Sequence, residues 1–89
     1  MILISHRGNL TGKQPESENT PIYIKQAVDK GYTVEIDIWG STNGSLYLGH
    51  DNPDHHISID FLFSGPYVIH AKNHLAIEPV QYHNLHWFW

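Results

Sequence analysis

The chain has no cysteine and few basic residues, and each of these shortages excludes a class of function. Without cysteine it forms no disulfide, no cysteine-ligated zinc site and no thiolate nucleophile. Its five lysines and arginines are scattered and are outnumbered by nine acidic residues, which gives a formal net charge of −4. Because nonspecific binding to nucleic acid needs a concentrated basic face, we expect no nucleic acid among its partners.

Long hydrophobic runs are also missing from these 89 residues. No stretch approaches the roughly 20 apolar residues that a transmembrane helix needs, so we expect no membrane span. The first residues lack the basic region, the apolar stretch and the cleavage site of a secretory signal peptide, and a cytoplasmic location is therefore the default expectation. Histidine, in contrast, is abundant, with eight copies in the chain.

The first half of the chain predicts a strand, a helix and a second strand. Residues 2–6 are a short apolar segment, and residues 32–39 alternate apolar with polar or acidic side chains, which is the period of a strand. Between them, Thr20 or Asn19 is placed to cap a helix, and Pro21 suits the first helical position. The second strand opens a hairpin at about residues 34–50, since the pair Asn43-Gly44 favours a tight turn.

The second half continues the alternation of strands and helices. The remaining predicted elements are a helical turn near residues 59–63, a strand over residues 66–72, a brief helix capped by Asn73 and disturbed by Pro79, and a strand within residues 85–89. Alternation of this kind indicates an α/β fold with parallel strands and right-handed crossovers.

The predicted helices are too few to cover a parallel sheet. Parallel sheets normally carry helices on both faces, and this chain supplies enough for one face only. We therefore expect residues 1–89 to be one partial domain, the N-terminal part of a larger α/β barrel with about three or four strands, truncated in mid-strand. An intact small domain is the alternative. Self-association through the truncated edge is a further expectation.

Two carboxylates stand two residues apart in the second strand. Side chains at this spacing point the same way, so Glu35 and Asp37 share one face of the strand while Ile36 points to the other. Two like charges this close repel each other unless solvent or a cation offsets the repulsion. The pair therefore indicates either a solvated strand face or a metal site.

Two histidines are expected near these carboxylates. His6 and Arg7 follow the first strand, and Gly8 then allows a turn or a close approach of other backbone. The hairpin returns His50 to about the level of Asp37, where His6 also lies if the first strand is a neighbour. Two imidazoles beside a carboxylate-bound cation suit phosphoester chemistry, because one takes a proton, the other donates one, and the cation stabilises the phosphoryl group.

Together these motifs resemble the N-terminal half of the glycerophosphodiester phosphodiesterases, a family of phospholipase-C-like phosphodiesterases. The matching pieces follow one another over residues 4–51 as His6-Arg7-Gly8, Glu18-Asn19-Thr20 opening a helix, Glu35-x-Asp37, the turn residue Gly44, and His50-Asp51. The resemblance implies a TIM-type (β/α)8 barrel that hydrolyses a small-molecule phosphodiester in lipid metabolism. The phospholipase D-like toxins of the same superfamily are a sister alternative, although the Arg-Gly after the first histidine favours the phosphodiesterases.

The resemblance also implies a role for each matching side chain. Glu35 and Asp37 would bind a divalent cation, Mg²⁺ or Ca²⁺. His6 and His50 would serve as acid and base, with the order between them left open. Arg7 would contact the substrate phosphate.

The chain departs from the family pattern at His70. The family's next strand carries Glu-x-Lys, and this chain has His70-Ala71-Lys72. Lys72 fits and would hold a phosphate oxygen as a point charge. His70 leaves three alternatives open. It is a metal ligand that shifts the metal preference of the site towards Mn²⁺ or Zn²⁺, or it contacts the metal ligands without binding the metal, or the site is degraded. The competing hypothesis is a noncatalytic, decayed barrel fragment that at most binds metal.

Overall fold

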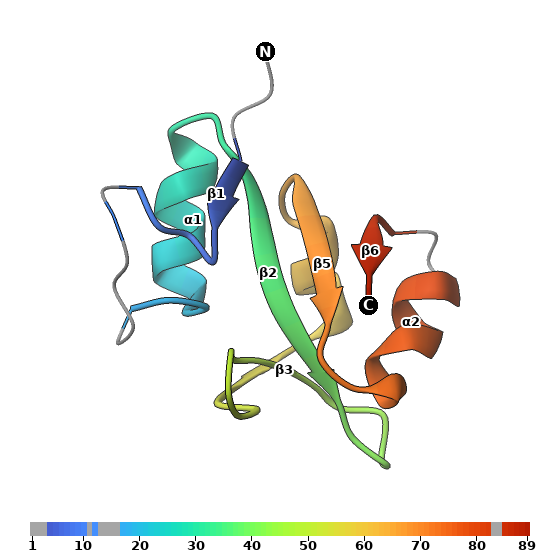
Figure 1. The fold of residues 1–89 in the computed structure, drawn as a ribbon. Coiled ribbons are helices and arrows are strands. Elements are labelled where there is room, and N and C mark those ends of the chain that lie inside the picture. The colour runs from blue at the N-terminus through green and yellow to red at the C-terminus, as the bar shows by residue number, and fades with distance from the viewer. Residues whose placement is uncertain (1–3, 11, 13–16, 83–84) are drawn as a thin grey trace.

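The computed structural model describes residues 4–10, 12, 17–82 and 85–89, so the start of the first predicted strand lies outside the described residues. Ten elements follow one another along the chain (Figure 1). They are β1 (Ile4–His6), α1 (Pro21–Asp29), β2 (Thr33–Gly40), β3 (Leu46–Leu48), β4 (His55–Ile57), the 3₁₀ helix η1 (Ile59–Phe63), β5 (Tyr67–Ala71), the 3₁₀ helix η2 (His74–Ala76), α2 (Ile77–Tyr82) and β6 (Trp87–Phe88).

The strands form one mixed sheet around β2. The order is β4-β3-β2-β5-β6, and β1 also pairs with β2. Strands β1, β2, β5 and β6 are parallel, whereas β3 and β4 extend the sheet as antiparallel strands. The beginning of β2 pairs with β1 and its end pairs with β3, while β5 runs along the other edge. The described residues are therefore a small mixed α/β domain, and the closed barrel stays a prediction.

Helix α1 begins where the sequence predicts. Thr20 is extended, with φ −92° and ψ 143°, and its hydroxyl accepts a hydrogen bond from the backbone N–H of Tyr23 at 3.4 Å. Pro21 takes the first helical position, where its missing N–H costs nothing. Ile24 and Ala27 then lie on the buried side of the helix.

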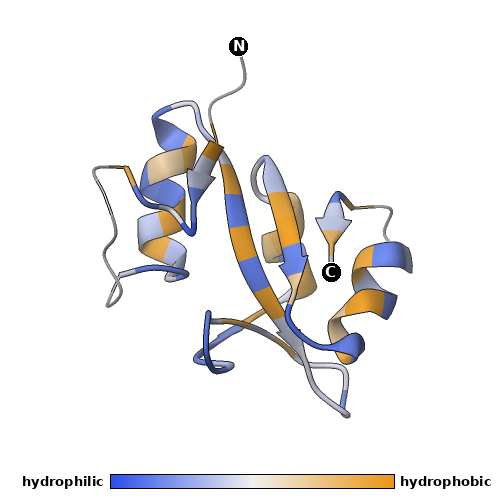
Figure 2. Cartoon of the chain, in the orientation of Figure 1, coloured by the Kyte–Doolittle hydropathy of each residue, from blue (hydrophilic) through white to orange (hydrophobic). Residues whose placement is uncertain are grey.

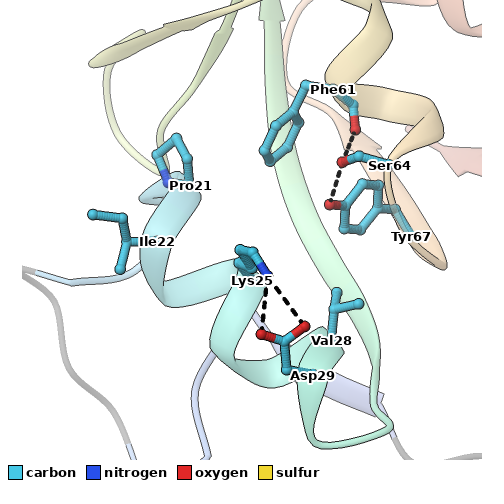
Figure 3. Close-up of a pocket in the computed structure, with 8 residues that line it drawn as sticks. All are labelled: Pro21, Ile22, Lys25, Val28, Asp29, Phe61, Ser64 and Tyr67. Carbon is cyan, nitrogen blue, oxygen red and sulfur yellow. Dashed lines mark hydrogen bonds and ion pairs between the residues drawn. The ribbon is translucent and has the colours of Figure 1, made fainter.

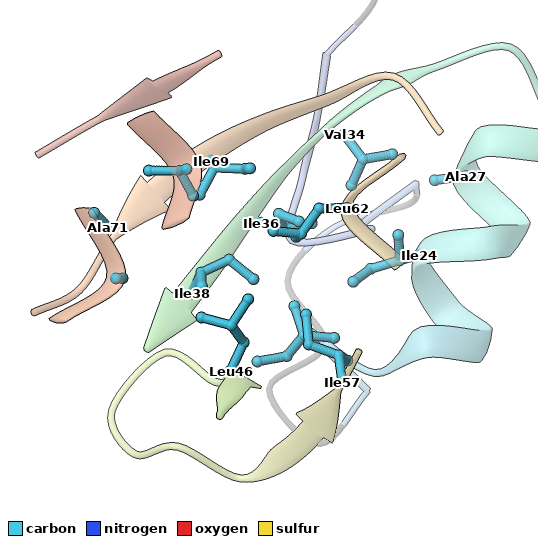
Figure 4. Close-up of a cluster of buried hydrophobic side chains, with 13 residues drawn as sticks. Ile24, Ala27, Val34, Ile36, Ile38, Leu46, Ile57, Leu62, Ile69 and Ala71 are labelled. Atoms are coloured by element: carbon cyan, nitrogen blue, oxygen red, sulfur yellow. The ribbon is translucent and has the colours of Figure 1, made fainter. Parts of the chain in front are cut away.

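One face of the sheet is the hydrophobic core. Hydrophobic and hydrophilic bands alternate along β2 (Figure 2). Val34, Ile36 and Ile38 belong to the core cluster, and all three are fully buried. Residues of the neighbouring strands β3, β4 and β5 and of α1, η1, η2 and α2 belong to the same cluster (Figure 4). Its members are Ile24, Ala27, Val34, Ile36, Ile38, Leu46, Leu48, Ile57, Leu62, Ile69, Ala71, Ala76 and Val80.

Two local predictions for the C-terminal part have different outcomes. Asn73 is the N-cap residue of η2, as predicted, but its side chain makes no capping hydrogen bond and bonds instead to the backbone N–H and C=O of Gly40, at 2.9 Å each. The prediction for Pro79 is wrong, because this residue lies in the first turn of α2, where backbone N–H groups have no partner within the helix. Strand β4 was not expected at all.

The strand register places the polar candidates on the face opposite the core. His6 pairs with Glu35 across β1 and β2, and Asp37 pairs with His70 across β2 and β5. Residues in register point the same way, so the four side chains share one face of the sheet. Separately, no helix in the described part of the chain has the length and apolarity to cross a membrane.

Candidate functional site

An imidazole and a carboxylate pair at the end of β1. Nε2 of His6 lies 2.8 Å from Oε1 of Glu35. The parallel register brings the two residues side by side, as the sequence predicts. The side chain of His6 is 54% exposed and that of Glu35 is 23% exposed. The pair is therefore open to a ligand from solvent.

Asp37 is fully buried beside this pair, and N–H groups surround its carboxylate. Its Oδ2 accepts a hydrogen bond from Nδ2 of Asn19 at 3.1 Å and lies 3.1 Å from Nε of Arg7. The Arg7 contact lacks hydrogen-bond geometry and is therefore an ion pair only. Its Oδ1 lies 3.0 Å from Nδ1 of His70. Burying a carboxylate is costly without such partners, and here each oxygen has at least one.

Arg7 bridges two carboxylates from different parts of the chain. Besides Asp37, its guanidinium reaches Glu18, with 3.0 Å between the terminal nitrogen and Oε1. The other carboxylate oxygen of Glu18 accepts a hydrogen bond from Nδ2 of Asn9 at 3.0 Å. These contacts tie the segment after β1, the turn before α1 and β2 together. Arg7, His6, Asn9 and Gly12 also line an open hollow of about 390 Å³.

The turn after β1 depends on Gly8. Its φ is +90°, a conformation that side chains with a Cβ rarely adopt. A Cβ built there would lie 3.0 Å from Cδ2 of Tyr23 and 3.2 Å from the backbone nitrogen of Ile24. The sequence offered a turn or a close approach as the reason for this glycine, and the structure has both.

His50 reaches the predicted level but turns to another partner. The backbone N–H of Gly49 contacts the carbonyl of Asp37 at 3.3 Å, and the indole of Trp39 donates to the carbonyl of Gly49 at 2.6 Å. The return of the hairpin is thus confirmed for the backbone. The contact described for the His50 side chain is with Asp51, 3.0 Å between Nδ1 and Oδ1. Among the described residues, the structure brings His6 to Glu35 and His50 to its neighbour Asp51.

His70 and Lys72 extend the site onto β5. The ring of His70 stacks on Phe88 of β6, with 4.6 Å between centroids and 7° between planes. Its side chain is 30% exposed. Lys72 follows the strand, and its backbone N–H donates to the carbonyl of Ile38 at 2.9 Å. Lys72 is two positions after His70, which is the spacing for the same face of an extended chain.

The carboxylates and the imidazole on this face are of the chemical types that bind a divalent cation. Within the described ranges, the structure contains no cluster of three or more His, Asp and Glu side chains that is arranged to hold a metal ion. The candidate ligands Glu35, Asp37 and His70 share one face of the sheet. Oδ2 of Asp37 contacts Asn19 and Arg7, and Oδ1 contacts the His70 imidazole, so a cation bound at Oδ1 would take the place of the His70 contact. Two carboxylates with an imidazole suit Mn²⁺ or Zn²⁺ better than Mg²⁺ or Ca²⁺.

A second hollow, of about 330 Å³, lies between α1 and the η1–β5 segment (Figure 3). Its lining is mostly apolar, and Phe61 stacks on Tyr67 within it. Its charged residues, Lys25 and Asp29, pair with each other at 3.0 Å. This hollow offers little acid–base chemistry, and the polar face remains the candidate site.

Sequence reasoning missed the part played by Glu18 and Asn19. The sequence predicts that the Glu-Asn-Thr motif opens a helix, and α1 is capped by Thr20. The two residues before it instead hold Arg7 and Asp37. The signal was present in the residue types, since a carboxylate and an amide are natural partners for a guanidinium and a buried carboxylate.

Comparison of the chain with protein-family models, with curated proteins and with solved structures finds no match. A function therefore has to be inferred from the geometry of the polar face and from the motifs that build it.

Proposed function

We propose that this domain takes part in metal-assisted hydrolysis of a small-molecule phosphodiester, as its resemblance to the glycerophosphodiester phosphodiesterases implies. One observation carries the proposal. The His6–Glu35 pair and the contacts of buried Asp37 with Arg7 and His70 are brought together by the adjacent parallel strands β1, β2 and β5. A proton-transfer group, a cationic group and carboxylates for a metal ion are thereby within one small region.

His6 is the proposed proton-transfer group. Glu35 holds its Nε2 at 2.8 Å, and a carboxylate in this position orients the ring and stabilises the imidazolium that forms when a proton is taken up. His50 is the second proposed group, carried on the segment that follows β3. Its reaction would require the imidazole to exchange Asp51 for the substrate.

Arg7 and Lys72 are the proposed phosphate-binding groups. Arg7 lines the same hollow as His6, so a phosphate there would lie beside the proton-transfer group, and its contact with the guanidinium would compete with Glu18 and Asp37. A planar guanidinium bonds two oxygens at once, and the lysine adds a point charge. Glu35, Asp37 and His70 would hold the cation, which when bound supplies stabilisation of the charge on the phosphoryl oxygens.

Hydrolysis of a chromogenic phosphodiester and of a glycerophosphodiester, with Mn²⁺, Zn²⁺, Mg²⁺, Ca²⁺ or a chelator, tests the proposal. His6→Ala is expected to lower the rate by about 10²- to 10⁴-fold, the usual contribution of a general acid or base. His56→Ala is the matched control, because this exposed histidine lies on β4 and contacts Tyr47. Activity that survives both His6→Ala and His50→Ala would overturn the proposal.

The rival proposal is a noncatalytic domain that binds metal only. It is favoured by His70, where the family has a carboxylate, and by the pairing of His50 with Asp51. Metal binding without turnover of either substrate would support this rival, whereas turnover that depends on His6 and on a divalent cation would exclude it.

A further inference from the structure

We propose that Asn19 is a positioning residue, which fixes the orientation of the Asp37 carboxylate on the polar face. Asn19 is 1% exposed and makes two hydrogen bonds to the same residue. Its Nδ2 donates to Oδ2 of Asp37 at 3.1 Å, and its Oδ1 accepts from the backbone N–H of Asp37 at 3.0 Å. The inference rests on the proposed function in so far as Asp37 is a metal-binding group.

The two bonds remove a freedom that a carboxylate otherwise keeps. The last torsion of an aspartate side chain has broad minima, so the plane of its carboxylate rotates easily. Asn19 engages Oδ2 and the backbone of the same residue, which leaves Oδ1 turned towards His70 at 3.0 Å. The amide cannot be reversed either, because the carboxylate needs a donor and the backbone N–H needs an acceptor. Asn19 thus fixes the rotation of the carboxylate plane, and with it the direction of the oxygen that faces His70.

The backbone of Asn19 supports the same role. Its φ is +58°, in the left-handed region, where asparagine is tolerated better than most residues. Its N–H donates to the carbonyl of Arg7 at 3.1 Å, and Arg7 itself has φ +57°. Two unusual backbone conformations therefore support each other at the point where the amide and the guanidinium meet Asp37. Backbone strain from such conformations is concentrated at functional sites of proteins.

Asn19→Gly is the variant that tests the amide. Glycine adopts the positive φ without strain, so the substitution removes the side chain and leaves the turn possible. We expect the affinity for Mn²⁺, measured by titration calorimetry, to fall about 10- to 100-fold, as it does when a residue that orients a metal ligand is lost. In the metal-free protein, the ring ¹⁵N signals of His70 should shift and the Asp37 amide should exchange with solvent at least about tenfold faster.

Asn73→Ala is the matched control. The amide of Asn73 also makes two bonds to β2, and both go to the backbone of Gly40, not to a carboxylate. Its loss should lower the melting temperature while leaving the Mn²⁺ affinity and the His70 ring signals unchanged. Equal effects of both variants on Mn²⁺ and on His70 would overturn the inference, because they would reflect a general loosening of β2.

The readouts separate this inference from the proposed function. If the natural chain binds no Mn²⁺ and hydrolyses nothing, the proposed function fails, and the His70 signals and Asp37 exchange alone decide the role of Asn19. If Asn19→Gly does not fold, the side-chain amide protons of Asn19 in the natural chain decide it. They should exchange more slowly than those of exposed Asn43, and equally fast exchange would overturn the inference.

Discussion

Gly8 illustrates how a single residue sets the geometry of the site. It has φ +90°, and a Cβ there would press against Tyr23 and the backbone of Ile24. Gly8→Ala is therefore expected to lower the free energy of unfolding by about 1–3 kcal/mol. Gly12→Ala is the control, because Gly12 has φ +118° with nothing within 4 Å of a built Cβ. Urea unfolding should show the larger loss for Gly8→Ala, and equal losses would mean that the close contact relaxes at no cost.

At this scale the sequence predicts which residues gather but not how each is bonded. The spacing of Glu35 and Asp37 correctly places them on one face, and the register confirms His6 beside Glu35. The enclosure of Asp37 by Asn19 could not be predicted, because it depends on a left-handed backbone at position 19. Local propensity permits that conformation for asparagine without requiring it.

At the scale of elements, local sequence signals predict where a helix begins better than they predict which strands pair. A capping threonine followed by proline correctly predicts the first residue of α1, because the chemistry of a helix start lies within a few residues. Strand β4 was missed, since its pairing of Ile57 with Leu46 spans a loop and its two histidines give no strand signal. Its place in the sheet depends on distant partners, as strand formation generally does.

The cap of α1 gives the prediction for this scale. The hydroxyl of Thr20 accepts from the N–H of Tyr23 at 3.4 Å and donates to the carbonyl of Ser17 at 2.8 Å. Thr20→Ala removes both bonds and should cost about 1 kcal/mol of unfolding free energy. Thr42→Ala, at an exposed position of the hairpin turn, should leave stability nearly unchanged. Thermal unfolding followed by circular dichroism would contradict the cap if the two variants melted together.

At the scale of the whole molecule, the sheet has a helix-packed core face and a polar face. The alternation along β2 predicts this division, because a period of two assigns every second side chain to each face. The orientation of His50 was beyond prediction, since it follows from the loop after β3 and from its pairing with Asp51. Whether further strands close the sheet into a barrel stays a prediction of the family resemblance.

The outer edge of β6 gives the prediction for the whole molecule. Among the described strands, β6 pairs with β5 alone, and the adjoining Trp89 is 66% exposed. An unpaired edge beside exposed apolar side chains is a template for pairing with another chain. We therefore expect light scattering to show an apparent mass that rises with protein concentration, and Trp89→Lys to suppress the rise while leaving the Phe88–His70 stack in place.

Phe63→Lys tests whether that association is specific to the edge. Phe63 is 55% exposed on η1, away from β6 in the sequence, so it matches Trp89 in exposure and aromatic character. If association were a general effect of exposed aromatic surface, the two lysine variants would suppress it equally. Pairing through β6 requires Trp89→Lys to act and Phe63→Lys to have little effect, and a natural chain that stays monomeric at every concentration would rule it out.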